Sequence, residues 1–368
     1  MLGLKELLEN HTSTAPPALA IPEKDGAIRC VACGHRCLIR PGRAGVCKVR
    51  FNQGGALHVP WGYVAGLQVD PIEKKPFYHA FPGRDALSFG MLGCDLHCAY
   101  CQNWVTSQAL RDEAAVAMPR FVTPKQLVAR AVQEEAPVIV STYNEPLITA
   151  DWAAAVFEEA HKAEIVCGFV SNGNATPEVI EFLQPWVSLY KVDLKSFQDR
   201  SYRQLGCKLQ TVLDTIGRLH TLGFWVEIVT LVIPEFNDTD EELGDIARFL
   251  AGISPDIPWH ITAFHPDYKM NDTGRTPAET LKRAWEIGRE AGLNFVYPGN
   301  LPGQFGDREH TACPGCGEIL IRRHGFYVVQ NRMAGRNCPR CQRDIPGVWE
   351  GNPPLESTGT GAPRALHI

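Results

Sequence analysis

Short apolar runs alternate with amphipathic segments through the middle of the chain, and this alternation predicts its architecture. The runs are rich in Val, Ile and Phe, as is typical of parallel strands that are covered on both faces. They occupy residues 86–92, 137–143, 165–171, 188–194, 224–233 and 258–264. Because strands that alternate with helices indicate a parallel sheet, we expect an α/β protein built on a partial (β/α)6 barrel.

Helix start signals lie between the predicted strands. Thr123, Thr239 and Thr276 each precede Gln or Glu by three residues, which is the spacing of a capping box. Thr176 is followed by Pro177, and proline is favoured at the first helical position. We expect a helix to begin at each of these four threonines.

Polar motifs follow the apolar runs at the points where the predicted strands end. Because the active sites of such sheets lie at the carboxyl ends of the strands, these motifs should meet in one site. The motifs are Cys94–Cys101, Tyr143-Asn144-Glu145-Pro146, Ser171-Asn172-Gly173, Asp193-Leu194-Lys195 and Phe264-His265.

Three cysteines carry the strongest chemical signal. Cys94, Cys98 and Cys101 form the pattern Cys-x3-Cys-x2-Cys directly after the first predicted strand. A structural zinc ion takes four ligands, and a cubane iron–sulfur cluster kept for electron transfer usually takes four cysteines. Three cysteines on a cubane leave one iron open for a small chelating molecule. The alternative is a zinc knuckle that takes a distant fourth ligand, such as His97.

Two further cysteine sets flank the predicted barrel. The C-terminal set has the spacing of a zinc ribbon, with a second iron–sulfur cluster as the alternative. The N-terminal set lies in a stretch, 26–69, that carries six cations and no acidic residue. It predicts another metal site, for either zinc or an auxiliary [4Fe–4S] cluster. The sets are Cys313, Cys316, Cys338 and Cys341, and Cys30, Cys33, Cys37 and Cys47.

Composition and charge narrow the possible functions. The chain is 45% hydrophobic and 21% charged, as is usual for a globular protein, and its net charge is −5. That charge gives no reason to expect nucleic acid or an anionic membrane as a partner. No apolar run is long enough to span a bilayer, and the acidic N-terminus does not resemble a signal peptide. We therefore expect a cytoplasmic protein whose paired cysteines bind metals rather than form disulfides.

These signals divide the chain into five predicted parts. They are a flexible leader (1–26), an N-terminal four-cysteine metal module with its linker (27–84), the partial barrel (85–303), a zinc ribbon (304–351) and a disordered tail rich in Gly, Pro, Ser and Thr (352–368).

The cysteine triplet, with the aromatic Tyr100 before its last member, resembles the signature of the radical S-adenosylmethionine (SAM) enzymes. The resemblance implies a [4Fe–4S] cluster on Cys94, Cys98 and Cys101, with SAM chelated at the open iron. It also implies reductive cleavage of SAM to methionine and a 5′-deoxyadenosyl radical that abstracts hydrogen. The cofactors carry this chemistry, while the protein orients them and excludes competing reactions. The expected redox partner is an electron donor such as flavodoxin or ferredoxin.

The other strand-end motifs resemble the branch of these enzymes that contains the pyruvate formate-lyase-activating enzymes. The segment 143–146 stands where that branch has Gly-Gly-Glu-Pro, which implies that Glu145 accepts hydrogen bonds from the SAM ammonium. The segment 171–173 resembles its Thr-Asn-Gly, in which a hydroxyl touches the SAM carboxylate. Here Val170 precedes the motif, where the activating enzymes carry an aspartate.

Asp193, Lys195 and His265 also match this branch. The match implies that Lys195 pairs with the SAM carboxylate and that His265 lies near the SAM ribose. Structural alternatives stay open: Glu145 could cap the following helix, Asp193 and Lys195 could pair with each other, and His265 could serve only the fold. The predicted SAM-binding set is Tyr100, Asn144, Glu145, Ser171, Asn172, Asp193, Lys195 and His265.

Longer motifs resemble the radical SAM enzymes of the AmmeMemoRadiSam system. They are the segments 70–79, 101–104, 142–146 and 264–267, together with the flanking cysteine modules. That family implies AMMECR1-like and Memo-like protein partners, and it leaves the substrate open between a protein residue, as in glycyl-radical activation, and a small molecule. An activating enzyme needs an open barrel mouth, whereas a small-molecule enzyme should close it with residues 50–84 or with the ribbon. The alternative function is a zinc-ribbon or iron–sulfur binding protein that acts on RNA or a protein partner.

Overall fold

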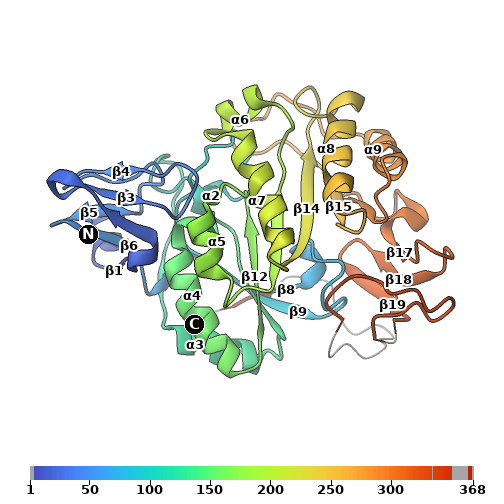
Figure 1. Cartoon of the computed structure of the whole chain (residues 1–368), viewed down its shortest axis with the longest axis horizontal. Coiled ribbons are helices and arrows are strands. Elements are labelled where there is room, and N and C mark those ends of the chain that lie inside the picture. The colour runs from blue at the N-terminus through green and yellow to red at the C-terminus, as the bar shows by residue number, and fades with distance from the viewer. Residues whose placement is uncertain (1–3, 334, 350–363, 367–368) are drawn as a thin grey trace.

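A nine-stranded sheet forms the centre of the protein, in a computed structural model that describes residues 4–333, 335–349 and 364–366. The strands are β8 (Gly66–Pro71), β9 (Asp85–Gly90), β11 (Val138–Ser141), β12 (Val166–Ser171), β13 (Leu189–Asp193), β14 (Trp225–Val232), β15 (Trp259–Ala263), β16 (Val296–Gly299) and β20 (Arg364–Ala365). Their spatial order is β16-β15-β14-β13-β12-β11-β9-β8-β20. From β16 to β9 all neighbours are parallel, whereas β8 and β20 join one edge antiparallel (Figure 1).

The six predicted strands are present as β9 and β11 to β15. The sequence prediction missed β16, a seventh parallel strand. Its run, Val296-Tyr297-Pro298-Gly299, is short and contains a proline, which cannot donate a hydrogen bond to a sheet ladder. The sheet tolerates Pro298 because β16 lies at its edge, beyond β15.

Helices between the parallel strands cover the sheet (Figure 1). Their buried faces are apolar: Phe157 of α4, for example, packs edge-on against Phe89 of β9 and Phe169 of β12. The α-helices are α1 (Leu4–Glu9), α2 (Trp104–Ser107), α3 (Pro124–Gln133), α4 (Ala150–Lys162), α5 (Pro177–Leu183), α6 (Asp199–Leu205), α7 (Leu209–Thr221), α8 (Asp240–Ile253) and α9 (Ala278–Glu290). The 3-10 helices are η1 (Pro17–Leu19), η2 (Lys24–Gly26), η3 (Ile72–Lys74), η4 (Pro146–Thr149) and η5 (Gly306–Glu309).

Three of the four predicted helix starts are confirmed. Thr123 forms a complete capping box at α3, and the hydroxyls of Thr176 and Thr239 cap α5 and α8. The prediction for Thr276 is wrong, because α9 begins at Ala278 without a side-chain cap. The Thr276 hydroxyl instead donates to the Val232 carbonyl (2.6 Å) and ties α9 to the end of β14.

An N-terminal module of two small sheets lies at one end of the barrel, drawn in blue in Figure 1. Residues 1–26 were expected to form a flexible leader, but residues 12–14 and 20–22 are strands that pair within these sheets. The sheets consist of β1 (Thr12–Thr14), β6 (Ala56–Pro60) and β5 (Phe51–Gln53), and of β2 (Ala20–Pro22), β3 (Ile28–Cys30) and β4 (Leu38–Ile39). A further pair, β7 (Tyr63–Val64) and β10 (Arg120–Phe121), closes the module against the barrel.

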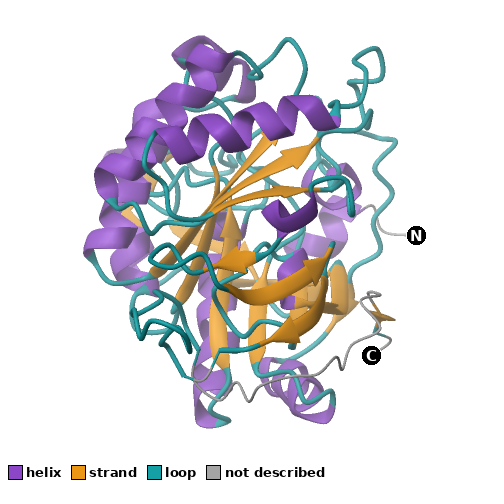
Figure 2. Cartoon of the chain, turned by 90° about the vertical axis from the view of Figure 1, so that its right-hand side faces the viewer, coloured by secondary structure: helices purple, strands orange, loops and turns teal. Residues whose placement is uncertain are grey.

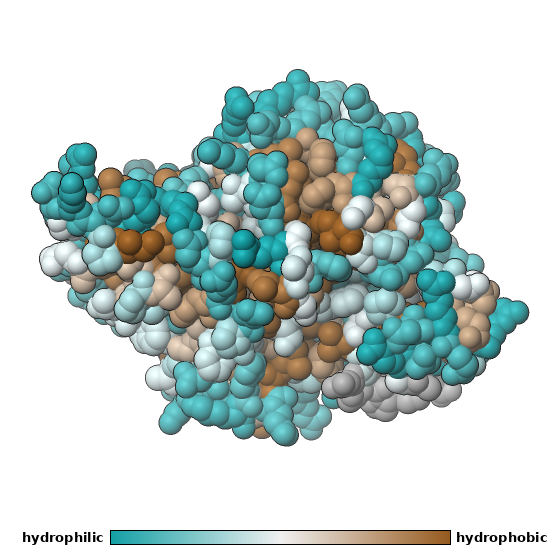
Figure 3. All heavy atoms as spheres, viewed as in Figure 1, coloured by the Kyte–Doolittle hydropathy of each residue, from teal (hydrophilic) through white to brown (hydrophobic). Residues whose placement is uncertain are grey.

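A C-terminal module lies at the other end and contains β17 (Thr311–Ala312), β18 (Ile319–His324) and β19 (Tyr327–Asn331). Figure 2 shows the β18–β19 hairpin in front of the strands of the central sheet. Its apolar side chains, including Leu320 and Ile321, pack with Tyr78 of the segment that precedes β9 and with Phe295 and Tyr297 at β16. The outer surface of this module, at the right of Figure 3, is mostly hydrophilic. Burial thus joins the module to the barrel rather than leaving it as a free appendage.

The predicted disordered tail lies largely outside the described residues. Of residues 352–368 the structure describes 364–366, where β20 pairs with β8 and Leu366 is buried. None of the described helices is both long and apolar enough to cross a lipid bilayer.

Candidate active site

A cavity of about 830 Å³ lies at the carboxyl ends of the parallel strands. Every residue of the predicted triplet and SAM-binding set lines this cavity, so the structure brings all of them together. They are Cys94, Cys98, Tyr100, Cys101, Asn144, Glu145, Ser171, Asn172, Asp193, Lys195 and His265. Its volume is within the range of small-molecule sites.

The cysteine loop leaves the end of β9 through Gly93. This residue has a φ of +94°, and a Cβ here would lie 2.9 Å from Val49 and 3.2 Å from the Cys47 carbonyl. Only glycine meets both requirements without strain. The loop then presents Cys94, whose Sγ accepts a hydrogen bond from the Leu96 backbone N–H (3.4 Å).

The three thiols fit a cluster better than a single metal ion. All three line one cavity, yet among the described residues they do not form a set of sulfurs within 4.8 Å of one another. Ligands of one ion must crowd together, whereas a cubane spreads its cysteines over different irons. Burial raises the pKa of Cys98 to about 11, and the nearby Lys195 ammonium opposes that rise. A [4Fe–4S] cluster holds its ligands as thiolates, so Lys195, which favours the charged form of Cys98, would assist cluster binding here.

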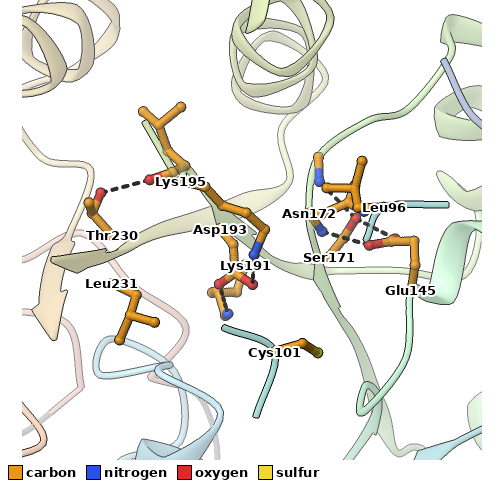
Figure 4. Close-up of polar contacts among 12 residues, drawn as sticks. Leu96, Cys101, Glu145, Ser171, Asn172, Lys191, Asp193, Lys195, Thr230 and Leu231 are labelled. Carbon is orange, nitrogen blue, oxygen red and sulfur yellow. Dashed lines mark hydrogen bonds and ion pairs between the residues drawn. The ribbon is translucent and has the colours of Figure 1, made fainter. Parts of the chain in front are cut away.

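Glu145 lies at the centre of a buried hydrogen-bond network (Figure 4). Its Oε1 accepts from the Ser171 hydroxyl (2.7 Å) and the Leu147 N–H (3.1 Å), and its Oε2 accepts from the Asn172 N–H (2.7 Å). Burial, with a smaller contribution from Asp95, raises the pKa of Glu145 to about 8. The predicted alternative, in which Glu145 caps the following helix, is thus present, since Glu145 caps η4. Its Oε2 nevertheless keeps a lone pair that can accept one more hydrogen bond. Because the Ser171 hydroxyl donates its hydrogen bond to Glu145, it positions that carboxylate.

Asn172 connects the strand ends to the cysteine loop. Its Nδ2 donates to Asp95 Oδ1 (2.7 Å), and Asn174 Nδ2 donates to Asp95 Oδ2 (2.8 Å). Asp95 is fully buried beside Cys94. On the neighbouring strand, Asn144 Oδ1 accepts from the Met91 N–H (3.0 Å), which fixes the end of β11 to the start of the loop. These amides hold the loop in place.

Asp193 pairs with two lysines inside the cavity (Figure 4). Lys195 Nζ lies 3.2 Å from Asp193 Oδ2, and Lys191 pairs with Oδ1. Burial raises the pKa of Asp193, but the two ammonium groups outweigh it and lower the pKa to about 2. The predicted Asp–Lys pairing alternative is thus present, and Lys195 also lies close enough to Cys98 to affect the pKa of that thiol.

Tyr100 and His265 complete the predicted set. Tyr100 packs edge-on against Phe236, with ring centroids 5.7 Å apart. His265 Nε2 accepts a hydrogen bond from Gln102 Nε2 (3.1 Å), so the residue after Cys101 holds the imidazole beside the cysteine loop.

Sequence reasoning missed a second polar group in the cavity. Lys75 Nζ donates to the Tyr143 hydroxyl (2.9 Å), which donates in turn to Asp70 Oδ2 (2.6 Å). Burial lowers the pKa of Lys75 to about 8, against the opposing effect of Asp70. The charged residues of segment 70–76 were visible in the sequence, but they were as compatible with a linker as with a wall of the site. Lys191 was missed because it lies inside an apolar strand run.

Two segments outside the barrel form walls of the cavity. The linker wall consists of Glu73–Tyr78, of which all but Phe77 line the cavity, and the hairpin tip consists of His324–Tyr327, between β18 and β19. Neither was in the predicted SAM-binding set, although residues 50–84 and the ribbon were named as segments that would close a small-molecule site.

The two flanking cysteine sets lie outside this cavity. Cys313, Cys316, Cys338 and Cys341 place their four sulfurs within 4.8 Å of one another, so this group could hold a metal ion. The N-terminal module contains the other set, and it contacts the cysteine loop through His35 and Asp95. This set is Cys30, Cys33, Cys37 and Cys47.

The sequence profile of the radical SAM superfamily matches residues 90–250, which contain the cysteine loop and the strand-end residues up to Lys195. The chain belongs to this superfamily. Membership implies an enzyme that uses SAM and a [4Fe–4S] cluster, so the radical SAM prediction is confirmed. Assignment to the AmmeMemoRadiSam system stays a prediction.

Individual relatives extend this result. Uncharacterized protein MJ0808 of Methanocaldococcus jannaschii is 34% identical over 325 residues, covering 87% of this chain and 96% of that protein, so the two belong to one family. The isethionate sulfite-lyase activating enzyme of Oleidesulfovibrio alaskensis is 27% identical over 128 residues, 32% of this chain and 40% of that enzyme. A solved domain of the pyruvate-formate lyase-activating enzyme from Bacteroides vulgatus is 18% identical with a TM-score of 0.39, covering 44% of this chain and 98% of that domain.

Proposed function

We propose that this protein is a radical SAM enzyme that removes a hydrogen atom from a small molecule bound beside the Cys94–Cys101 loop. When bound, a [4Fe–4S] cluster supplies one electron that cleaves SAM to methionine and a 5′-deoxyadenosyl radical. An external low-potential donor, of the flavodoxin or ferredoxin class, replaces that electron. The choice of a small molecule rests on one observation: the linker wall and the hairpin tip both line the cavity, whose volume of about 830 Å³ suits a small-molecule site.

Buried contacts hold the linker wall against the barrel. Glu227 of β14 accepts hydrogen bonds from the backbone N–H groups of Tyr78 and His79 (2.9 Å each) and from His260 Nε2 (2.7 Å). Glu227 and His79 are completely buried. Opening this wall would remove two hydrogen bonds from a buried carboxylate, which is costly in the interior.

A buried arginine joins the linker wall to the C-terminal module. Arg323 Nη2 donates to the Tyr78 carbonyl (2.8 Å), and its Nε lies 3.5 Å from Glu73 Oε1. Both charged side chains have no exposed surface. The hairpin tip in turn touches the end of the barrel, where a Cβ on Gly325 would lie 3.2 Å from Pro302. These contacts fix two walls that narrow the cavity, which favours a small molecule over a protein loop as the substrate.

Residues of the cavity would bind SAM and orient it. Glu145 keeps an acceptor free for the SAM ammonium, and Lys195 supplies a cation for its carboxylate. Asp193 limits the positive charge of the cavity by pairing with Lys191 and Lys195. Glu145 and Lys191 are buried, so little water competes with their charged contacts.

We also propose that the C-terminal cysteines hold zinc. Zinc–sulfur bonds of about 2.3 Å in a tetrahedron place sulfurs about 3.8 Å apart. The Cys313–Cys341 and Cys316–Cys338 sulfur distances are 3.5 and 3.7 Å. Burial raises the pKa of Cys338, but the backbone N–H groups of Cys341 and Arg340 outweigh it and lower the pKa to about 7. Metal analysis of the wild type and Cys338→Ala should show one zinc per chain lost with this cysteine.

The competing function is activation of a glycyl-radical protein, which the name of the Oleidesulfovibrio alaskensis relative suggests. To separate the two, an extract of the source organism would be divided by ultrafiltration into low-mass and macromolecular fractions. Each would be added to reconstituted protein with SAM and dithionite, and 5′-deoxyadenosine would be measured. We expect the low-mass fraction to raise its formation above the unstimulated rate. Stimulation by the macromolecular fraction alone would contradict the proposal.

A further inference from the structure

The N-terminal cysteines form a compact, buried group. The β3–β4 pairing brings Cys30 and Cys37 together, since the Cys30 N–H donates to the Cys37 carbonyl (2.9 Å). The turn that carries Cys47 approaches from the other side, and a Cβ on Gly45 would lie 3.5 Å from Cys37 Sγ. Cys33 lies in the turn between β3 and β4 and, like Cys30 and Cys47, is buried. All four cysteines therefore meet in one part of the module.

The spacing of these sulfurs differs from that of the C-terminal set. The four C-terminal sulfurs all lie within 4.8 Å of one another, but among the described residues no three N-terminal sulfurs do. The three sulfurs of the Cys94–Cys101 triplet also do not meet this criterion. Within one chain, the N-terminal set thus resembles the cluster-binding triplet rather than the group suited to one ion.

A buried cation faces this group. Arg50 is 1% exposed, pairs with Asp151 and donates to the Ile148 carbonyl (3.2 Å). It lies close enough to Cys30 and Cys47 to interact with their charges. Its Nε is buried and has no hydrogen-bond partner among the described residues. An unsatisfied buried donor is costly, and the sulfur atoms of a cluster would satisfy it.

The N-terminal group is also attached to the cysteine loop of the active site. His35, two residues after Cys33, places its Nε2 3.1 Å from the Asp95 carbonyl oxygen. The Gly34 N–H donates to the Asn174 carbonyl (2.8 Å), and Asn174 holds the Asp95 carboxylate. Asp95 directly follows Cys94. Two short hydrogen-bonded paths therefore connect the two cysteine groups.

We propose that Cys30, Cys33, Cys37 and Cys47 bind a second [4Fe–4S] cluster, adjacent to the one on Cys94, Cys98 and Cys101. Four cysteines complete its coordination, so no iron is left open for SAM and the available chemistry is one-electron transfer. One electron enters from the external donor and one leaves toward the SAM site, with no bond made or broken. This inference does not depend on the size of the substrate.

Metal content separates this proposal from a zinc site. The full-length chain, purified without oxygen and reconstituted with iron and sulfide, should contain about eight irons, and the variant with alanine at 94, 98 and 101 about four. Cys33→Ala/Cys47→Ala should also retain about four, whereas Cys167→Ala, a buried cysteine outside all three sets, should match the wild type. Should the Cys33→Ala/Cys47→Ala variant not fold, the triplet variant still decides.

Electron paramagnetic resonance gives a second readout that does not need turnover. In the reduced wild type, two adjacent paramagnetic clusters should broaden or split each other's signals. The triplet variant and Cys33→Ala/Cys47→Ala should each show a single undisturbed cluster signal, and of these two SAM should change the signal only in Cys33→Ala/Cys47→Ala. A wild type with about four irons, with or without a second zinc ion, would overturn the proposal.

Discussion

Arg323 joins the linker wall to the C-terminal module, so replacing it should loosen both walls of the cavity. Its guanidinium donates to the Tyr78 carbonyl and to the Thr311 hydroxyl (2.7 Å) and lies beside Glu73. The substitution Arg323→Met keeps much of the apolar volume but removes the charge. Glu73 would then be a buried carboxylate without its cation.

The expected cost is large because one partner of a buried pair is left behind. Breaking such a pair costs about 3–5 kcal/mol, and about 3 kcal/mol in local opening corresponds to on the order of hundredfold faster amide exchange. Burial raises the pKa of Glu73 to about 7, and Arg323 opposes that rise. Without Arg323 the pKa rises further. The deficit should therefore be greatest above pH 7, where wild-type Glu73 is ionised, and smaller at pH 5, where Glu73 is protonated.

Hydrogen exchange measured by mass spectrometry over residues 73–83 and 318–331 tests this expectation. Arg322→Met is the matched control, because Arg322 is the exposed neighbour on β18. The double variant Glu73→Leu/Arg323→Met should recover most of the protection, since it leaves no unpaired charge. If Arg323→Met exchanges like Arg322→Met, the two walls are not held by this contact and the argument for a small-molecule substrate loses its support.

Three further variants test the site itself. Glu145→Gln should weaken SAM binding by about 1.5–3 kcal/mol in an equilibrium binding assay, because a charge-assisted acceptor is lost; unchanged affinity would remove Glu145 from the SAM site. Asp193→Asn should lower stability at pH 7 by about 1–2 kcal/mol in thermal unfolding, the pair being partly exposed to solvent. Because the folded-state pKa of Asp193 is lowered to about 2 from an ordinary 3.8, that deficit should shrink as the pH falls toward 2, and a deficit independent of pH would refute the pairing. Gly93→Ala should reduce iron incorporation into the cysteine loop, measured against Gly217→Ala, where a Cβ meets open space; equal iron content would show that the loop tolerates the change.

Local pattern was enough to predict the strands and the candidate site. The apolar runs that became β9 and β11 to β15 end in polar residues, and parallel pairing brings those ends to one edge. Eleven predicted residues consequently line one cavity. The same reasoning missed β16, because Pro298 obscures a strand that only its edge position permits.

The sequence indicated which segments could wall the cavity, residues 50–84 and the ribbon, but not the contacts that hold them, because these join distant parts of the chain. Arg323 meets Glu73 across 250 residues, and nothing local distinguishes Arg323 from the exposed Arg322. The role of Ser171 was likewise hidden, since its hydroxyl proton is used by Glu145 on the neighbouring strand end. Sequence spacing predicted which cysteines group together but left their metals open, and the packing of the N-terminal set beside Asp95 emerges only from the fold.

The most direct test of the account is the formation of 5′-deoxyadenosine from SAM by the anaerobically reconstituted protein with dithionite. We expect the wild type and Cys167→Ala to form 5′-deoxyadenosine and methionine in equal amounts, and Cys98→Ala to form neither. If the wild type forms no 5′-deoxyadenosine, or if Cys98→Ala forms as much as the wild type, the three-cysteine loop is not the site of SAM cleavage and the proposed function is wrong.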